Sequence, residues 1–214
     1  MTIAAKICGL SSEAAVAAAV ESGAAFLGFV FYPPSPRAVS PRRAAELCAA
    51  VPSGVQRVGL FVDAGDDAIR AVLDIAPIDI LQFHGHESPE RVAAVKRRFD
   101  RPVMKSIAVA APEDVLAAAG YEAVADMLLF DAKPPRRADA LPGGNGLAFD
   151  WHLIAGHEWR QPWMLSGGLT ADLLAEAVRI SGAAAVDVSS GVERRPGDKD
   201  PDKIREFLRV ARTL

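Results

Sequence analysis

The sequence predicts a (β/α)8 barrel, in which eight parallel strands close into a sheet inside a ring of helices. Eight short apolar runs recur along the 214 residues, and alanine-rich segments with helical spacing separate most of them. Eight strand–helix units in this length leave roughly 27 residues for each, which is enough for such a barrel. In addition, polar residues and glycines gather at the C-terminal ends of the runs.

The alternative architecture is an open, doubly wound parallel sheet. Such sheets more often carry a glycine fingerprint directly after the first strand, and Cys8-Gly9-Leu10 has no such pattern. No linker composition divides the chain, so we expect a single domain over residues 1–214.

The expected strands are short runs rich in β-branched, aromatic and other apolar side chains. In chain order they cover residues 3–8, 26–31, 57–62, 78–83, 103–108, 127–131, 163–166 and 185–188.

The expected helices begin at residues that favour helix N-termini. Ser11 or Ser12 precedes the first helix, Ser40 the second, Ser88 the fourth and Asp200 the last. The predicted helical ranges are 12–22, 41–51, 66–76, 88–99, 112–119, 171–180 and 201–211.

The sixth strand–helix unit is the least regular. Only residues 149–154 suggest a helix there, and a loop rich in proline and glycine runs before them from Lys133 to Gly146. Loops of this length in compact domains are usually functional or disordered.

The composition limits the classes of function. Hydrophobic residues make up 50% of the chain and charged residues 24%, and the net charge of -3 argues against nucleic acid as the main partner. No apolar run is long enough to cross a bilayer, and the N-terminus does not resemble a signal peptide. Cys8 and Cys48 lie too far apart for a metal or redox motif, so we expect a reducing, cytoplasmic location.

Polar residues mark one end of the predicted barrel. Active sites of (β/α)8 barrels are formed at the C-terminal ends of the strands. Those ends carry Cys8-Gly9, Arg37 in the loop after the second strand, Asp63, His84-Gly85, Lys105-Ser106, Asp131, Ser166-Gly167-Gly168 and Asp187-Val188-Ser189-Ser190-Gly191. The N-terminal ends are plainer, and this asymmetry indicates an enzyme.

Glycines in the last three loops predict a phosphate site. Gly167 and Gly168 precede the helix at 171–180, and Ser189, Ser190 and Gly191 follow the eighth strand. Glycine lets backbone amides approach an anion, and barrels of this class commonly bind phosphate between the seventh and eighth loops. The segment Gly143-Gly144-Asn145-Gly146 is placed to close over the same phosphate; ordinary turns are the alternative explanation.

Cys8 ends the first predicted strand and has two interpretations. A cysteine there is either a small core residue, as most buried cysteines are, or a thiol that faces the active site. Lys6 lies two residues earlier on the same strand face and favours an ionised thiol.

The ordered set of motifs resembles the phosphoribosylanthranilate isomerase family, whose members are (β/α)8 enzymes of tryptophan biosynthesis. The resemblance runs from Lys6 to Phe207. It rests on Lys6-Ile7-Cys8-Gly9, Gly28-Phe29-Val30-Phe31 with Ser35-Pro36-Arg37, Gln82-Phe83-His84-Gly85, Gly143-Gly144-Asn145-Gly146 with Phe149-Asp150-Trp151, Ser166-Gly167-Gly168-Leu169, Asp187-Val188-Ser189-Ser190-Gly191-Val192-Glu193, Pro196-Gly197 and Lys199-Asp200. One departure is Asn145, where the family usually has threonine or serine.

The resemblance implies an Amadori rearrangement of N-(5-phosphoribosyl)anthranilate to the 1-deoxyribulose phosphate product. It implies Asp131 as the general acid that opens the ribose ring and Cys8 as the general base that takes the C2′ proton. The iminium intermediate is itself the electron sink, so no metal and no organic cofactor is expected. Asp131 must keep its proton near neutral pH for this role, which partial burial beside Phe130 favours.

The resemblance also implies substrate contacts. Arg37 looks like the cation that pairs with the anthranilate carboxylate, or else it is a solvated loop arginine. His84 lies near the pocket in the family, or is hydrogen-bonded for structure only. Asp187 resembles a carboxylate that orients ribose hydroxyls, and its alternative is a buried partner of Lys6 or Lys105.

Three other functions stay open on the sequence alone. A metal-dependent sugar-phosphate epimerase needs several ligands at strand ends, where His84 is the one histidine. A sister isomerase for another phosphoribosyl substrate favours aspartate at the position of Cys8. A non-catalytic phosphate-binding barrel predicts that Cys8→Ala and Asp131→Asn change binding only. In every case the expected partner is a small phosphorylated molecule, and the chain is expected to be a monomer or a homodimer.

Overall fold

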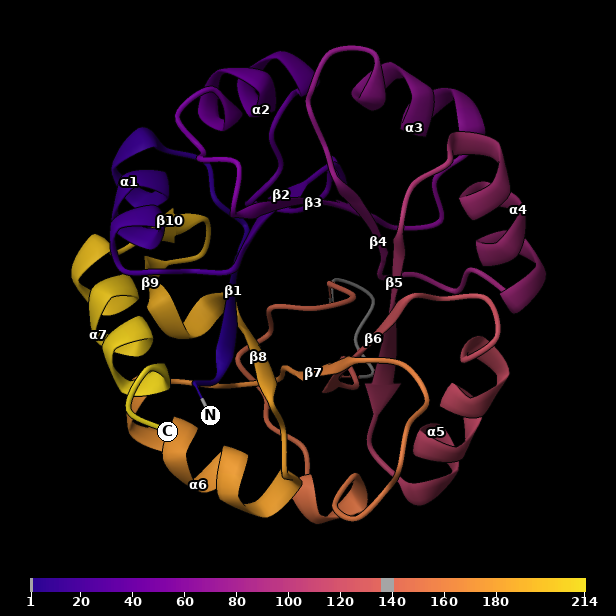
Figure 1. Ribbon diagram of the computed structural model, residues 1–214, viewed down its shortest axis with the longest axis vertical. Coiled ribbons are helices and arrows are strands. Elements are labelled where there is room, and N and C mark those ends of the chain that lie inside the picture. The colour runs from indigo at the N-terminus through magenta and orange to yellow at the C-terminus, as the bar shows by residue number, and fades with distance from the viewer. Residues whose placement is uncertain (1, 136–140) are drawn as a thin grey trace.

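Strands β1 to β8 are parallel and form a closed barrel in a computed structural model that describes residues 2–135 and 141–214. β1 pairs with β8, from Ala4 opposite Ala185 to Ile7 opposite Val188, and this pairing closes the sheet (Figure 1). The predicted barrel is therefore confirmed, and the open sheet is excluded. The strands are β1 (Ala4–Cys8), β2 (Phe26–Val30), β3 (Gln56–Phe61), β4 (Ile80–Phe83), β5 (Val103–Val109), β6 (Met127–Ala132), β7 (Trp163–Leu165) and β8 (Ala185–Val188).

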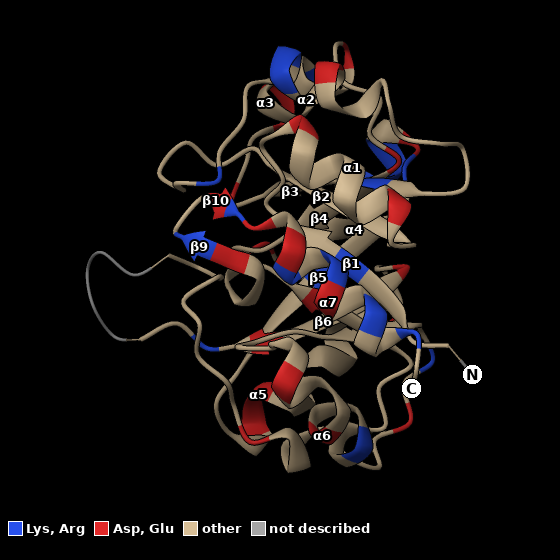
Figure 2. Ribbon diagram, turned by 90° about the vertical axis from the view of Figure 1, so that its left-hand side faces the viewer, with Lys and Arg blue, Asp and Glu red and all other residues tan. Residues whose placement is uncertain are grey.

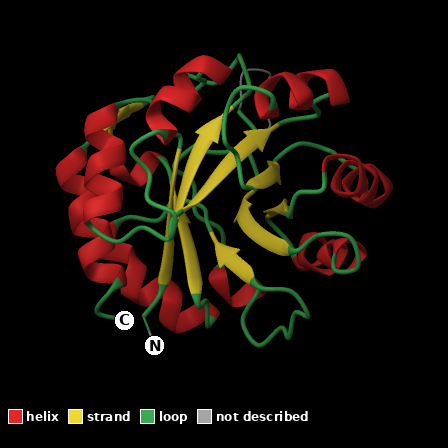
Figure 3. Ribbon diagram, turned by 45° about the horizontal axis from the view of Figure 1, so that its top comes forward, coloured by secondary structure: helices red, strands yellow, loops and turns green. Residues whose placement is uncertain are grey.

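Helices surround the barrel, as Figures 1 and 3 show. They are α1 (Glu13–Glu21), α2 (Pro41–Cys48), α3 (Asp66–Leu73), α4 (Pro89–Phe99), α5 (Pro112–Leu116), α6 (Ala171–Ser181) and α7 (Pro201–Ala211). The predicted N-caps Ser12, Ser40, Ser88 and Asp200 each accept a hydrogen bond from a backbone N–H of the first turn. Within the described residues, no helix is both long and apolar enough to span a membrane.

Two helices are shorter than the sequence predicts. α2 ends at Cys48 instead of residue 51, and α3 ends at Leu73 instead of residue 76. Each predicted end lies directly before a proline, Pro52 or Pro77, and a proline disfavours helical backbone in the residue before it. The chain leaves the helix early in order to enter that turn.

The sixth unit carries a single turn of 3-10 helix, η2 (Trp151–Leu153), where the sequence offers only a short candidate at 149–154. Asp150 caps this turn by accepting a hydrogen bond from the backbone N–H of His152 at 3.1 Å. Residues 136–140 of the long loop predicted before it lie outside the described residues. In the fifth unit, α5 continues into another 3-10 turn, η1 (Ala117–Tyr121), in place of the single helix predicted over 112–119.

A small hairpin after β8 is absent from the sequence-based prediction. A short 3-10 turn, η3 (Ser190–Val192), leads into β9 (Glu193–Arg195), which pairs in antiparallel fashion with β10 (Asp198–Lys199). Acidic and basic residues alternate closely on this hairpin (Figure 2), so no apolar run marks it as a strand. Its position beside the strand ends makes it part of the site described below.

The barrel interior is filled in layers. Alternate residues of each strand point inward, because strand side chains alternate between the two faces. Cys8, Val30 and Leu60 form an apolar group near the C-terminal strand ends. Below them lies a second apolar layer, made of Val58, Ile80, Met104, Leu129 and Met164. The site at the strand ends therefore has an apolar floor.

Candidate active site

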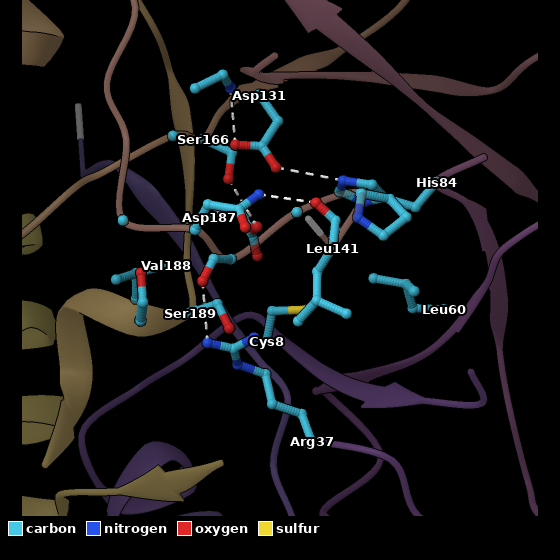
Figure 4. A pocket seen from close by; sticks show the side chains of 18 of the residues that line it. Cys8, Arg37, Leu60, His84, Asp131, Leu141, Ser166, Asp187, Val188 and Ser189 are labelled. Atoms are coloured by element: carbon cyan, nitrogen blue, oxygen red, sulfur yellow. Dashed lines mark hydrogen bonds and ion pairs between the residues drawn. The ribbon is translucent and has the colours of Figure 1, made fainter. Parts of the chain in front are cut away.

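An open pocket lies over the C-terminal strand ends, with a volume of about 740 Å3 that includes the part open to solvent. This size suits a small organic ligand. The lining comes from seven of the eight strand ends or the loops that follow them (Figure 4). It includes every residue that the sequence places in the site, namely Cys8, Arg37, His84, Asp131, Gly144, Asn145, Gly146, Gly167, Gly168, Asp187, Ser189, Ser190 and Gly191.

Cys8 lies at the end of β1 beside a buried ion pair. Lys6 Nζ donates to Asp187 Oδ1 at 2.8 Å, and Ser166 Oγ donates to the other carboxylate oxygen of Asp187 at 3.0 Å. Gly28 on β2 makes room for these groups, because a Cβ there would lie 3.0 Å from Cys8 Sγ and 3.3 Å from Lys6 Nζ. One side of the barrel mouth therefore holds an ammonium, a carboxylate and a thiol together.

Burial and the charge of Lys6 have opposite effects on the pKa of Cys8. Burial raises the pKa of the Cys8 thiol, and the positive charge of Lys6 offsets only part of that rise. Burial also disfavours the Lys6 ammonium, but attraction to Asp187 and Cys8 outweighs it and raises the pKa of Lys6. Lys6 therefore keeps its positive charge beside a thiol that holds its proton at neutral pH.

Asp131 is the second-last residue of β6, and its side chain points toward His84, as Figure 4 shows. Its Oδ2 lies 3.2 Å from His84 Nε2, and its Oδ1 accepts a hydrogen bond from the N–H of Ala132 at 2.8 Å. On the far side of the imidazole, Gln82 Nε2 lies 3.1 Å from His84 Nδ1. With the Gln82 amide assigned as donor, the ring proton is on Nε2 and points at Asp131.

Arg37 is held at the mouth of the pocket. Its Nε and Nη2 donate to the two carboxylate oxygens of Glu193 at 2.8 and 2.9 Å, and Nη2 also donates to the carbonyl of Gly144 at 3.1 Å. The side chain is buried, with 5% of its surface exposed. The arginine is therefore not the solvated loop residue considered as an alternative.

The glycine-rich loops close one side of the pocket. Gly167 and Gly168 have φ angles of +89° and +64°. A Cβ at Gly167 would lie 2.8 Å from the backbone nitrogen of Ala132, so that turn accepts no larger residue. Asn145 donates its side-chain amide to the carbonyl of Leu141 at 2.8 Å and so stabilises its own loop.

The contacts show which lysine pairs with Asp187. Asp187 is the buried partner of Lys6, because the two residues stand opposite each other in the β1–β8 register. Lys105 points out of the barrel and pairs with Glu87 at 2.9 Å. It lines no part of the pocket.

The sequence assigned no role to Glu193 or Lys199, although both are buried beside the pocket. Their motif was visible in the sequence, but Arg37, which links them to the pocket, lies far away in the loop after β2. The sequence indicates a position inside the barrel more clearly for Ser166. This residue stands at a strand end, two residues after the inward-facing Met164. No group of three or more histidine, cysteine, aspartate or glutamate residues suitable for a metal occurs in residues 2–135 and 141–214.

Comparison with known proteins gives one consistent result. A family model described as N-(5'phosphoribosyl)anthranilate (PRA) isomerase matches residues 5–210. The N-(5'-phosphoribosyl)anthranilate isomerase of Paracoccus denitrificans is 57% identical over 208 residues, which cover 97% of this chain and 96% of the relative. The chain belongs to the N-(5'-phosphoribosyl)anthranilate isomerase family.

Solved structures agree with this placement. The phosphoribosyl anthranilate isomerase from Thermotoga maritima has a TM-score of 0.88 and 36% identity over 99% of this chain and 100% of its own. A second isomerase structure, solved in complex with reduced 1-(o-carboxyphenylamino)-1-deoxyribulose 5-phosphate, has a TM-score of 0.85 and 34% identity over the same shares of the two chains. Membership in the phosphoribosylanthranilate isomerase family confirms the predicted enzyme, an isomerase of tryptophan biosynthesis.

Proposed function

We propose that this pocket converts N-(5-phosphoribosyl)anthranilate to 1-(2-carboxyphenylamino)-1-deoxyribulose 5-phosphate with Asp131 as general acid and Cys8 as general base. The observation that carries the proposal is the convergence of these two residues with Arg37 and the glycine-rich loops on one pocket. The substrate has a matching set of groups: a carboxylate, a sugar whose bonds rearrange and a phosphate.

Ring opening is the first step. Asp131 transfers a proton to the ribose ring oxygen as the C1′–O4′ bond breaks, and the lone pair of the anthranilate nitrogen forms the C1′=N iminium bond. His84 Nε2 lies 3.2 Å from Asp131 Oδ2 and orients the carboxyl group by a hydrogen bond. Gly143 packs on this pair, since a Cβ there would lie 2.5 Å from His84 Nε2 and 2.9 Å from Asp131 Oδ2.

Proton abstraction is the second step. The Cys8 thiolate takes the C2′ proton, the C2′–H electron pair forms the C1′=C2′ bond, and the iminium π pair returns to nitrogen. The resulting enolamine becomes the ketone when C1′ takes a proton from water and the C2′ hydroxyl returns one to Asp131, while the Cys8 thiol releases its proton to water. A thiolate whose pKa is raised is scarce but strongly basic, and the Lys6 ammonium stabilises its charge.

Binding determinants lie at the two ends of the pocket. Arg37 accepts the anthranilate carboxylate, because guanidinium and carboxylate match in geometry. Gly144, Asn145, Gly146, Gly167, Gly168, Ser189, Ser190 and Gly191 hold the phosphate through backbone N–H groups and hydroxyls. Asp187 and Ser166 face the ribose between them. The whole chain acts as one catalytic domain in the cytoplasm, as a monomer or a homodimer.

The proposal is tested with purified protein and freshly made phosphoribosylanthranilate, whose anthranilate group fluoresces. The expected result is a fluorescence decay whose rate scales with protein concentration and which Asp131→Asn abolishes. A protein that binds the substrate and leaves the fluorescence unchanged contradicts the proposed function.

A further inference from the structure

Glu193 lies beside the pocket, between Arg37 and Lys199. It is the first residue of β9, and its carboxylate is 4% exposed. Oε1 accepts hydrogen bonds from Arg37 Nε at 2.8 Å and from Lys199 Nζ at 2.7 Å, and Oε2 accepts one from Arg37 Nη2 at 2.9 Å. One carboxylate therefore holds two buried cations, one from the loop after β2 and one from β10.

Each cation in turn holds a loop of the pocket. Arg37 Nη2 donates to the carbonyl of Gly144, in the loop that closes over the pocket. Lys199 Nζ donates to the carbonyl of Ser189 at 2.9 Å and to its hydroxyl at 3.1 Å. Through these contacts, the position of Glu193 determines the orientation of Arg37 at the carboxylate end. It also determines, through Lys199, the position of the Ser189 loop at the phosphate end.

The geometry leaves part of Arg37 free for a ligand. Within the part of the chain that the structure describes, Nη1 has no protein acceptor, whereas Nε and Nη2 are both engaged. The charges also suit an anionic ligand, because two cations and one carboxylate leave the cluster with one positive charge. A fork of two hydrogen bonds from one carboxylate fixes the plane of the guanidinium before the ligand arrives.

We propose that Glu193 is a positioning residue that orients Arg37 toward the substrate carboxylate and, through Lys199, holds the Ser189 loop for the phosphate. This inference rests on the proposed function, since it assumes that Arg37 binds the carboxylate. Glu193 touches neither end of the substrate itself. Its loss therefore weakens both ends at once, whereas loss of Arg37 removes the carboxylate contact and leaves the contacts of Lys199 with Ser189 in place.

The test measures dissociation constants by titration calorimetry for three probes: reduced 1-(o-carboxyphenylamino)-1-deoxyribulose 5-phosphate, the same compound without its carboxyl group, and inorganic phosphate. Wild-type protein is expected to prefer the carboxylate-bearing probe at least about tenfold, because charged hydrogen bonds contribute strongly. In Glu193→Ala this preference falls at least about fivefold, and the phosphate dissociation constant rises at least about threefold. In Arg37→Ala the preference is lost, and the phosphate dissociation constant rises less than in Glu193→Ala, because Lys199 still holds Ser189.

Control variants separate this role from general destabilisation. Glu206→Ala removes an exposed carboxylate on α7 that pairs with Arg209, and it is expected to leave all three constants unchanged. Glu193→Gln keeps the side-chain volume and carries the test if Glu193→Ala does not fold. Steady-state kinetics of either Glu193 variant are expected to show a raised KM with kcat reduced less than KM is raised.

The outcomes distinguish the positioning role of Glu193 from the proposed carboxylate site at Arg37. A Glu193 variant that folds and keeps both the carboxylate preference and the phosphate affinity overturns the positioning role, while loss of the preference in Arg37→Ala still supports the proposed function. A wild-type protein without any preference for the carboxylate overturns the carboxylate site at Arg37, and the positioning role falls with it.

Discussion

At the scale of single residues, the surroundings of a side chain decide its role more than its residue type does. Cys8 is as buried as many core cysteines, yet Lys6 and Asp187 beside it give it a charged neighbourhood. Cys48, the other cysteine, is also buried, and burial raises its pKa to about 11, but it lines no part of the pocket. The difference between a structural and a chemical cysteine therefore lies in the side chains around it.

Asp131→Asn tests the general acid. The amide keeps the shape of the side chain but has no acidic proton, so kcat is expected to fall by about 10²–10⁴-fold. The affinity for inorganic phosphate should stay near the wild-type value, because the amide keeps the side-chain shape that packs against Gly143 and Gly167. Asp126→Asn is the matched control, since Asp126 directly precedes β6 at the end away from the pocket. An unchanged kcat in Asp131→Asn refutes the role as acid.

Arg37→Ala tests the carboxylate contact. Removal of a charged hydrogen-bonding partner costs about 1.5–3 kcal/mol, so KM should rise roughly 10–100-fold with a smaller change in kcat. The exposed Arg42→Ala on α2 is the control, since Arg42 lies outside the pocket. Equal weakening of substrate analogues that lack the carboxylate would show that the arginine acts on something else.

The ionisation of Cys8 can be followed by alkylation. Burial raises its pKa above the ordinary value of 9.0, so the thiolate fraction should increase about tenfold for each pH unit through the neutral range. In a Cys48→Ala background, the iodoacetamide rate should therefore keep rising with pH up to at least pH 9. A plateau near pH 7 contradicts the raised pKa, and Lys6→Met is expected to slow the reaction further.

At the scale of elements, sequence patterns predict the strands and caps well and predict the irregular parts poorly. All eight strands follow from apolar runs, and Ser12, Ser40, Ser88 and Asp200 mark helix starts because capping is local chemistry. The early ends of α2 and α3 depend on the prolines that follow them. The β9–β10 hairpin could not be predicted, since charged residues form its strands and its stability comes from Arg37, far away in the sequence.

The Glu193 carboxylate in the β9–β10 hairpin makes the free energy of unfolding depend on pH. Burial disfavours the Glu193 carboxylate, but hydrogen bonds from Arg37 and the charge of Lys199 outweigh it and lower its pKa below 4.5. A lowered pKa adds stability that is present above pH 4.5 and is lost as the pH falls through the lowered value. At pH 7, Glu193→Gln should therefore be about 3–5 kcal/mol less stable than wild type, because it leaves buried cations unpaired.

Urea denaturation at several pH values measures this effect. The difference in the free energy of unfolding between wild type and Glu193→Gln should be constant from pH 7 to about pH 5 and should become smaller below pH 4.5. Other carboxylates titrate in both proteins and cancel in the difference. A gap that stays the same at pH 3 shows that the ion pair does not carry the stability of the hairpin.

At the scale of the whole molecule, barrel closure explains why residues far apart in sequence form one site. β1 and β8 become neighbours only when the sheet closes, and this places Lys6 opposite Asp187. Because strand side chains alternate between the two faces of a sheet, the same side of the sheet carries Cys8, Asp131, Ser166 and Asp187. Site membership could be predicted from the sequence for this reason, because every parallel strand of a barrel ends at the same face.

Pairing within the site could not be predicted in the same way. The contacts of Arg37 with Glu193 and of Lys105 with Glu87 depend on loop paths and on which face each side chain takes. The sequence left Asp187 with two possible lysine partners, and only the closed register selects Lys6. Fold and site location thus follow from local patterns and topology, whereas the electrostatics of the site require the three-dimensional arrangement.

The most direct test of the account is the release of deuterium from substrate labelled at C2′. Wild-type protein is expected to transfer the label to solvent water in step with product formation. Cys8→Ser should slow this release by about 10²–10⁴-fold, because a hydroxyl is a far poorer base, while Cys48→Ser should match wild type. Release at the wild-type rate in Cys8→Ser contradicts the assignment of Cys8 as the general base.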